Sequence, residues 1–212
     1  MTQELERILS LTTKTRSKIE NIDKPSLVKM LGQAYRMEVE KTNQKLIIDE
    51  TLKANINKVA LWLLSPQKQG LLLYGTVGNG KTTLAKALIS VLDAYNQATE
   101  HGLWAERVKR ISAYDMQTAA RTGDTEFASL KNTYRLFIDD IGIEESGIKN
   151  YGNVICPFSE LLFHRYDKNR LTVLTSNLTL EQMEFKYGIR VKDRILGMFD
   201  RISFNTKSYR TR

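Results

Sequence analysis

The sequence has little of what several protein classes require. It has one cysteine, Cys156, and therefore cannot form an intrachain disulfide, which favours a reducing compartment. Two histidines and one cysteine also argue against a zinc site. No apolar run approaches the roughly 20 residues that cross a bilayer, and the first residues lack the basic and apolar regions of a signal peptide. We therefore expect a cytoplasmic protein with no membrane partner.

The charge of the chain is net positive and unevenly distributed. The net charge is +8, and residues 186–212 hold eight basic residues against two acidic ones. A basic face suits phosphate-rich partners, either a nucleotide or a nucleic acid. Many soluble proteins are mildly basic, however, so the charge does not choose between a binding face and a solvated one.

The most informative stretch is residues 70–83. An apolar run at 71–74 predicts a short buried strand, and apolar residues at helical spacing begin at Leu84. Between them the sequence fits the phosphate-binding pattern GxxxxGK(S/T) in its expected strand–loop–helix context, although a glycine-rich turn can match by chance. The predicted nucleotide-binding residues are Gly75, Thr76, Val77, Gly78, Asn79, Gly80, Lys81, Thr82 and Thr83.

The residue types of this loop explain the chemistry that it predicts. Glycines let the backbone adopt positive φ and approach a phosphate chain closely. The N–H groups of the loop and of the following helix start form an anion site. Lys81 is expected to reach the β- and γ-phosphates and to act in catalysis, and Thr82 is expected to hold Mg²⁺.

Two acids follow a second apolar run. Residues 134–138 predict a buried strand, and Asp139 and Asp140 come directly after it. This arrangement is typical of the Walker B strand of ATPases. We expect Asp139 to position Mg²⁺, mostly through its waters, and Asp140 to orient and polarise the attacking water. A strand that simply ends in a polar turn is the alternative, and the preceding P-loop makes it less favourable.

A third strand is predicted at 171–176 and is followed by Asn177. In open parallel sheets, ligands bind at the carboxyl ends of the strands. We therefore expect Asn177 to lie beside Asp139 and Asp140, where it can hydrogen-bond the γ-phosphate or the water. Without the two preceding motifs, a turn asparagine would be the default interpretation.

The remaining sequence predicts mostly helices. Residues 1–45 form two helical segments separated near Pro25, and a partner-binding arm and a plain helical extension remain equally open. Other predicted elements are helices at 46–65, 84–100, 113–121 and 158–166, a strand within 103–111, a loop at 143–157, and a helix that starts with a capping box at Thr179 and Gln182.

Four motifs thus follow one another: the P-loop, the Asp-Asp strand, a strand that ends in Ser-Asn, and residues 187–194 leading to Ser208-Tyr209-Arg210. Together they resemble the AAA+ ATPases of the DnaC/DnaI helicase-loader and IstB transposition-helper group. The resemblance covers roughly residues 45–212. The P-loop differs at Thr76, Val77 and Asn79, where the group often has prolines and threonine, and the first 45 residues match nothing in the group.

The resemblance implies roles for further residues. Asn177 resembles sensor 1. Arg194 resembles the arginine finger, which completes the ATP site of a neighbouring subunit, and Arg210 resembles the sensor 2 arginine, which acts on the subunit's own nucleotide. Arg190 is the alternative for either arginine. An arginine supplied in trans makes activity depend on self-association into an ATP-dependent oligomer.

The resemblance also implies the fold and the function. We expect an α/β P-loop domain at 46–212 with a parallel sheet of about five strands between helices, no full C-terminal lid, and a helical arm at 1–45. The implied activity is Mg²⁺-dependent ATP hydrolysis by a DnaC-like loader that acts on single-stranded DNA and a replicative helicase. An IstB-like partner of a transposase is the alternative, and a P-loop small-molecule kinase or a non-hydrolysing scaffold fits less well.

Candidate DNA contacts are the basic residues near the second strand and the tail. They are Lys109, Arg110 and Lys207, and the helix from 114 to 121 is a further candidate. A solvated basic face would have the same composition.

Overall fold

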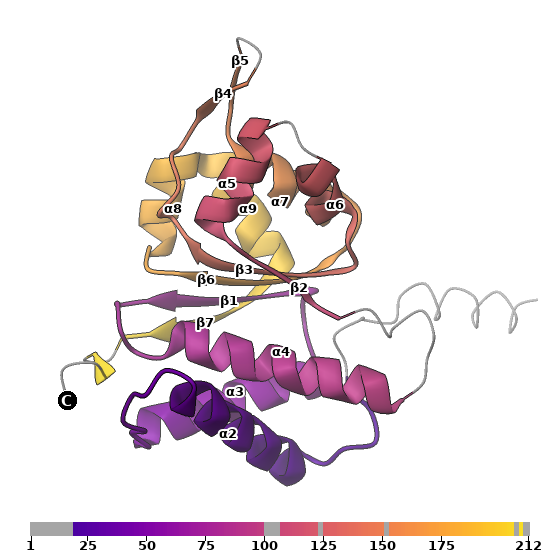
Figure 1. Ribbon diagram of the computed structural model, residues 1–212, viewed down its shortest axis with the longest axis vertical. Coiled ribbons are helices and arrows are strands. Elements are labelled where there is room, and N and C mark those ends of the chain that lie inside the picture. The colour runs from indigo at the N-terminus through magenta and orange to yellow at the C-terminus, as the bar shows by residue number, and fades with distance from the viewer. Residues whose placement is uncertain (1–18, 100–106, 123–124, 151–152, 206–207, 210–212) are drawn as a thin grey trace, which may run out of the picture.

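The computed structural model describes residues 19–99, 107–122, 125–150, 153–205 and 208–209. Its centre is a parallel sheet of five strands in the order β2–β3–β6–β1–β7 (Figure 1). The predicted α/β class with about five parallel strands is therefore confirmed. The strands are β1 (Gly70–Gly75), β2 (Lys109–Ser112), β3 (Arg135–Ile141), β6 (Leu171–Ser176) and β7 (Phe199–Phe204).

The three central strands are those that the apolar runs predict. β1, β3 and β6 are buried along nearly their whole length, as expected for parallel strands covered on both faces. The sequence does not predict the edge strand β7, because the charged Asp200 and Arg201 interrupt its apolar residues. It pairs with β1 from Gly70–Phe199 to Gly75–Phe204, and so supports the strand that leads into the P-loop.

Helices cover both faces of the sheet (Figure 1). One layer holds α2 (Lys24–Glu40), α3 (Glu50–Leu64) and α4 (Lys81–Ala98). The opposite layer holds α5 (Ala113–Thr122), α6 (Thr125–Asn132), α7 (Pro157–Asp167), α8 (Leu180–Tyr187) and α9 (Ile189–Met198). Each layer packs a separate apolar cluster against its own face of the sheet. Within the described residues, no helix is long and apolar enough to cross a membrane.

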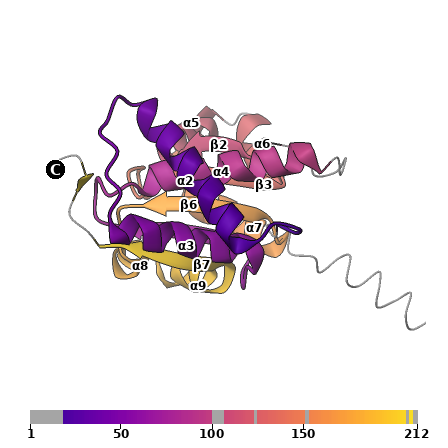
Figure 2. The same ribbon diagram turned by 90° about the horizontal axis from the view of Figure 1, so that it is seen from below.

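Helix α2 belongs to the core of the layer that carries the P-loop helix. Asp23 accepts a hydrogen bond from the Ser26 N–H at its start, and Pro25 occupies the first turn, where a missing N–H costs nothing. Its buried side chains join the cluster that includes α3 and α4. Figure 2, from below, shows α2 lying across α3 and α4. This crossing brings α2 close to the nucleotide-binding motifs.

Two predicted segments differ in detail from the structure. The helix expected at 46–65 begins only at Glu50, because Asp49 takes an extended conformation and caps it by accepting from the Leu52 N–H. The loop expected at 143–157 contains a short antiparallel hairpin, β4 (Ile148–Asn150) and β5 (Asn153–Ile155). Strands of three residues are too short to show an alternating pattern. The capping box at Thr179 and Gln182 is confirmed.

Candidate nucleotide-binding site

The P-loop connects β1 to α4 at the carboxyl edge of the sheet, as the sequence predicts. Gly80 precedes the helix with φ +85°, a left-handed conformation that glycine adopts without steric cost. A Cβ at this position would lie 2.5 Å from the Tyr35 hydroxyl oxygen. The positive φ therefore favours glycine here, and a Cβ would also force the Tyr35 hydroxyl to move.

Lys81 is buried within the loop. Its ammonium donates to the carbonyl oxygens of Gly75 at 3.1 Å and Thr76 at 2.6 Å, and to Asn79 Oδ1 at 3.2 Å. Asn79 in turn donates from Nδ2 to the Phe204 carbonyl oxygen at 2.7 Å. Asn79, one of the positions at which this P-loop differs from those of the DnaC/DnaI and IstB group, thus anchors the loop to β7 and holds the Lys81 ammonium.

Asp139, the first of the two acids near the end of β3, contacts the P-loop helix directly. Thr82 Oγ1 donates to Asp139 Oδ1 at 2.8 Å, and the hydroxyl of Thr175 on β6 donates to the same oxygen at 2.5 Å. Thr175 Oγ1 also accepts from the Asp140 N–H at 2.8 Å. One buried hydroxyl therefore fixes both acids, and Thr175 is a functional candidate that the sequence motifs leave unassigned.

Asp140 has a conformation that is uncommon for a residue with a side chain. Its φ is +57°, and the pairing of β3 with β6 shifts register between Ile138 and Ile141. Asn177 Nδ2 donates to Asp140 Oδ1 at 3.3 Å. The structure therefore brings together Asp139, Asp140 and Asn177, as the parallel-sheet argument anticipates.

A cavity of about 420 Å³ lies over these motifs. One side is formed by the P-loop with Lys81, Thr82, Asp140 and Asn177. The other side comes from residues outside the motifs: Tyr35, Val39, Gln44, Lys45, Ile47 and Tyr209. This second side combines apolar and aromatic groups with a few polar ones, which is the usual lining of a site for an organic ligand.

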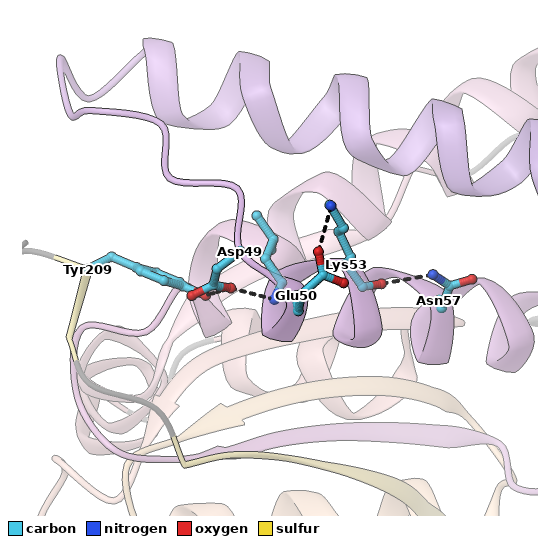
Figure 3. Close-up of polar contacts among 6 residues, drawn as sticks. Asp49, Glu50, Lys53, Asn57 and Tyr209 are labelled. Carbon is cyan, nitrogen blue, oxygen red and sulfur yellow. Dashed lines mark hydrogen bonds and ion pairs between the residues drawn. The ribbon is translucent and has the colours of Figure 1, made fainter.

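The residues of this second side are tied to one another and to the P-loop. Tyr209 donates from its backbone N–H to the Gly78 carbonyl oxygen at 2.8 Å and from its hydroxyl to Asp49 Oδ1 at 2.9 Å (Figure 3). Burial, and secondarily the charge of Asp49, raise the pKa of Tyr35 to about 12, so its hydroxyl is harder to ionise in the folded chain than in the unfolded one. The sequence gives no signal for Tyr35, because its position is an ordinary buried one in a helix.

The donor set at Thr82 and Asp139 fits Mg²⁺. Mg²⁺ binds through hard oxygens, commonly one or two protein groups completed by phosphate oxygens and waters. A hydroxyl and a carboxylate oxygen 2.8 Å apart at the mouth of a phosphate-binding loop satisfy that requirement. In the described part of the chain, no cluster of three His, Cys, Asp or Glu residues offers an all-protein metal site.

The predicted arginines lie away from this cavity or outside the described residues. Arg190 and Arg194 lie on α9, in the helix layer opposite α4 (Figure 1). The Arg194 guanidinium stacks over the Tyr166 ring at 4.4 Å and is partly exposed. Arg210 and Lys207 fall outside the described residues. Among the residues that the structure describes, no arginine lines the cavity.

The candidate DNA contacts that can be placed are on the surface near β2 and α5, each close to an acid. Lys109 lies 3.9 Å from Glu126, Arg110 pairs with Asp93 at 2.9 Å, and Arg121 of α5 pairs with Glu145 at 2.7 Å. Local pairing lowers the net positive charge of this region, and a DNA-binding role for it remains a prediction.

Comparisons with known proteins agree with this fold. No family model and no curated protein matches the sequence. Among solved structures, DnaI matches with a TM-score of 0.54 and 20% identity, covering 79% of this chain and 93% of that one. The DnaC helicase loader matches with a TM-score of 0.55 and 18% identity, covering 76% and 94%. The replication initiator DnaA, bound to AMPPCP and single-stranded DNA, matches with a TM-score of 0.50 and 17% identity, covering 76% and 49%. The chain therefore shares its fold with the solved DnaI and DnaC structures.

Proposed function

We propose that this chain is an AAA+ ATPase, which binds ATP with Mg²⁺ and hydrolyses it. The observation that carries the proposal is the shared carboxylate oxygen of Asp139, which accepts from Thr82 of the P-loop helix and from Thr175 of β6. Lys81, Thr82 and Asp140 line one cavity, and Asp139 lies within hydrogen-bonding distance of Thr82. A scaffold that only holds a nucleotide has no need for an acid such as Asp140 in that position.

Each side chain has a role that its position allows. The P-loop amides and Lys81 bind the phosphates, and Thr82 with Asp139 would hold Mg²⁺, which neutralises phosphate charge when bound. Asp140 orients and polarises the attacking water. Asn177 donates to Asp140, and its amide can also reach the water or the γ-phosphate. Tyr35, Val39, Ile47 and Tyr209 would surround the nucleoside.

We infer that a second subunit completes the site. An arginine that stabilises the transition state can raise the rate of phosphoryl transfer by several orders of magnitude. None of the described arginines lines the subunit's own cavity. Arg194 on α9 is the proposed finger, with Arg190 as the alternative. Hydrolysis per subunit should then rise with protein concentration.

The proposed biological role is that of a DnaC-like loader of a replicative helicase that acts on single-stranded DNA. Support comes from the shared fold, since the DnaC structure is that of a helicase loader and the DnaA structure contains single-stranded DNA. The sequence motifs point to the same group. An IstB-like role beside a transposase uses the same ATP chemistry with a different client.

The deciding experiment measures ATP hydrolysis per subunit against protein concentration, with and without single-stranded DNA. Asp140→Asn is the matched control for contaminating ATPase, because it keeps the side-chain shape and removes the carboxylate. A rate that rises with concentration and with DNA supports the proposal; a rate equal to that of the control contradicts it. Loading of a hexameric helicase onto circular single-stranded DNA, which has no free end, then tests the loader role against the transposase alternative.

A further inference from the structure

A second cavity, which we call the α2–α3 groove, lies between α2 and α3. It has a volume of about 640 Å³. Its floor is apolar and is formed by Val28, Leu46, Leu52 and Ile56, with Ile48 54% exposed beside them. An exposed apolar concavity next to a polar surface is typical of an interaction site. Tyr35 lines both cavities, and the other described residues of the groove are separate from those of the nucleotide-binding cavity.

The rim of the groove is basic. Lys29 and Arg36 border it from α2, and Lys53 borders it from α3 (Figure 3 shows Lys53 on the side of α3 that faces α2). Lys53 pairs with Glu50 at 2.7 Å, an exposed ion pair that competes weakly with other partners. No carboxylate is among the described residues that line the groove. The rim therefore favours a negatively charged occupant.

Gly32 is the most informative residue of the groove. It lies in the middle of α2, where glycine costs about 1 kcal/mol of helix stability relative to alanine. A Cβ built at Gly32 would have no heavy atom within 4 Å. Packing within the chain therefore does not require glycine here. Its missing side chain instead leaves the wall of the groove open.

We propose that the α2–α3 groove binds an acidic amphipathic helix of a partner protein. A groove between two helices accepts the apolar face of a third helix, and anchoring residues at i, i+3/i+4 and i+7 would fill the floor. The basic rim would meet acidic residues along the edges of that helix. Single-stranded DNA also carries negative charge. Among the described residues that line the groove, however, the only aromatic one is Tyr35, which is buried and so cannot stack on a base. The proposal does not depend on ATP hydrolysis.

The test uses the full chain and a synthetic helical peptide with leucines on one face and glutamates on the other. Fluorescence anisotropy measures its binding, and the same peptide with lysines in place of glutamates is the matched control. A labelled oligothymidylate tests the nucleic-acid alternative. We expect the acidic peptide to bind at least about tenfold more tightly than the basic one, a difference of about 1.4 kcal/mol.

Two kinds of variant locate the binding. Gly32→Leu fills the groove from an open helix surface and should weaken acidic-peptide binding about tenfold or more, whereas Gly32→Ala should leave it nearly unchanged. The double variant Lys29→Glu/Arg36→Glu should reverse the preference between the two peptides. It also keeps the test decisive if Gly32→Leu fails to fold, which circular dichroism would show.

Three results would overturn the proposal. The first is equal affinity for the acidic and basic peptides. The second is unchanged peptide binding by folded Gly32→Leu and by the charge-reversed variant. The third is oligothymidylate binding that these variants abolish while peptide binding persists, which would identify the groove as a DNA site. A wild-type ATPase rate in Gly32→Leu separates this proposal from the proposed nucleotide chemistry.

Discussion

Thr175→Val tests the claim that one hydroxyl positions both acids of the site. Thr175 is fully buried, donates to Asp139 Oδ1 at 2.5 Å and accepts from the Asp140 N–H at 2.8 Å. Valine keeps nearly the same shape and removes only these two hydrogen bonds. If Mg²⁺ takes the Thr82 hydroxyl, Thr175 still holds the Asp139 carboxylate, so the effect should persist in the loaded enzyme.

The expected cost follows from the two bonds. A hydrogen bond to a charged group contributes about 1.5–3 kcal/mol, and a buried N–H left without a partner costs about 1–3 kcal/mol. Neighbouring groups relax in part, so we expect a loss of about 3 kcal/mol in the free energy of unfolding. For a chain of this size, that corresponds to a fall in Tm of about 6–12 °C. Turnover should fall about 10- to 100-fold, because both acids lose their orientation.

Two measurements check this prediction, with Thr175→Ser as the control that keeps the hydroxyl. Denaturant unfolding gives the stability change, and ATP hydrolysis at increasing Mg²⁺ concentration, well below the Tm, gives turnover and the metal dependence. Thr175→Val should need more Mg²⁺ for half-maximal turnover, whereas Thr175→Ser should remain close to wild type. A valine variant with wild-type turnover and Mg²⁺ dependence would refute the positioning role, even if its stability had fallen.

Four further outcomes are expected. Asp140→Asn should retain ATP binding by calorimetry, since asparagine tolerates φ near +57° and the site keeps its shape. It should lose turnover because the carboxylate is gone, and normal turnover would place the water-orienting group elsewhere. Arg194→Ala and Lys81→Ala subunits, each inactive alone, should regain ATP hydrolysis when mixed, and failure at every ratio would contradict a finger in trans. Gly80→Ala should abolish ATP binding in calorimetry and lower the Tm. Adding Tyr35→Phe should recover only part of the Tm loss, because it relieves the clash with the hydroxyl while the positive φ at position 80 remains. Tyr35 should lose its proton near pH 10 in the unfolded chain and near pH 12 in the folded one. Between these pH values the free energy of unfolding should therefore fall more steeply in wild type than in Tyr35→Phe. Denaturant titrations at several pH values measure this difference.

The part of the site that the P-loop, the Asp-Asp strand and Asn177 form could be predicted, because each of these motifs is a local sequence signal. A buried strand, a glycine-rich loop and a helix follow one another within the P-loop segment, and the apolar runs before Asp140 and Asn177 mark strands whose ends must meet in a parallel sheet. Strand order itself is tertiary information. That Thr175 rather than another residue contacts Asp139 depends on β3 and β6 being neighbours in one register.

The other half of the site could not be predicted, because it depends on packing between distant segments. Tyr35 reaches the P-loop only because α2 crosses α4, and a helical pattern reports which face is buried but not what covers it. Tyr209 arrives from the far end of the chain after β7. That strand was obscured by Asp200 and Arg201, which an edge strand can expose to solvent on one side.

The conformation of Asp140 explains how two consecutive acids serve one site. In a regular strand, successive side chains point to opposite faces, so Asp139 and Asp140 would face apart. Thr175, in β6, and Asn177, just after the end of β6, nevertheless contact Asp139 and Asp140 respectively. The break in register after Ile138 and the positive φ of Asp140 interrupt the regular strand at the two acids, so both carboxylates can contact residues at the carboxyl end of β6. A β-branched residue at this position would be strained at that φ, so the local backbone, as well as the carboxylate, restricts which residue can follow Asp139.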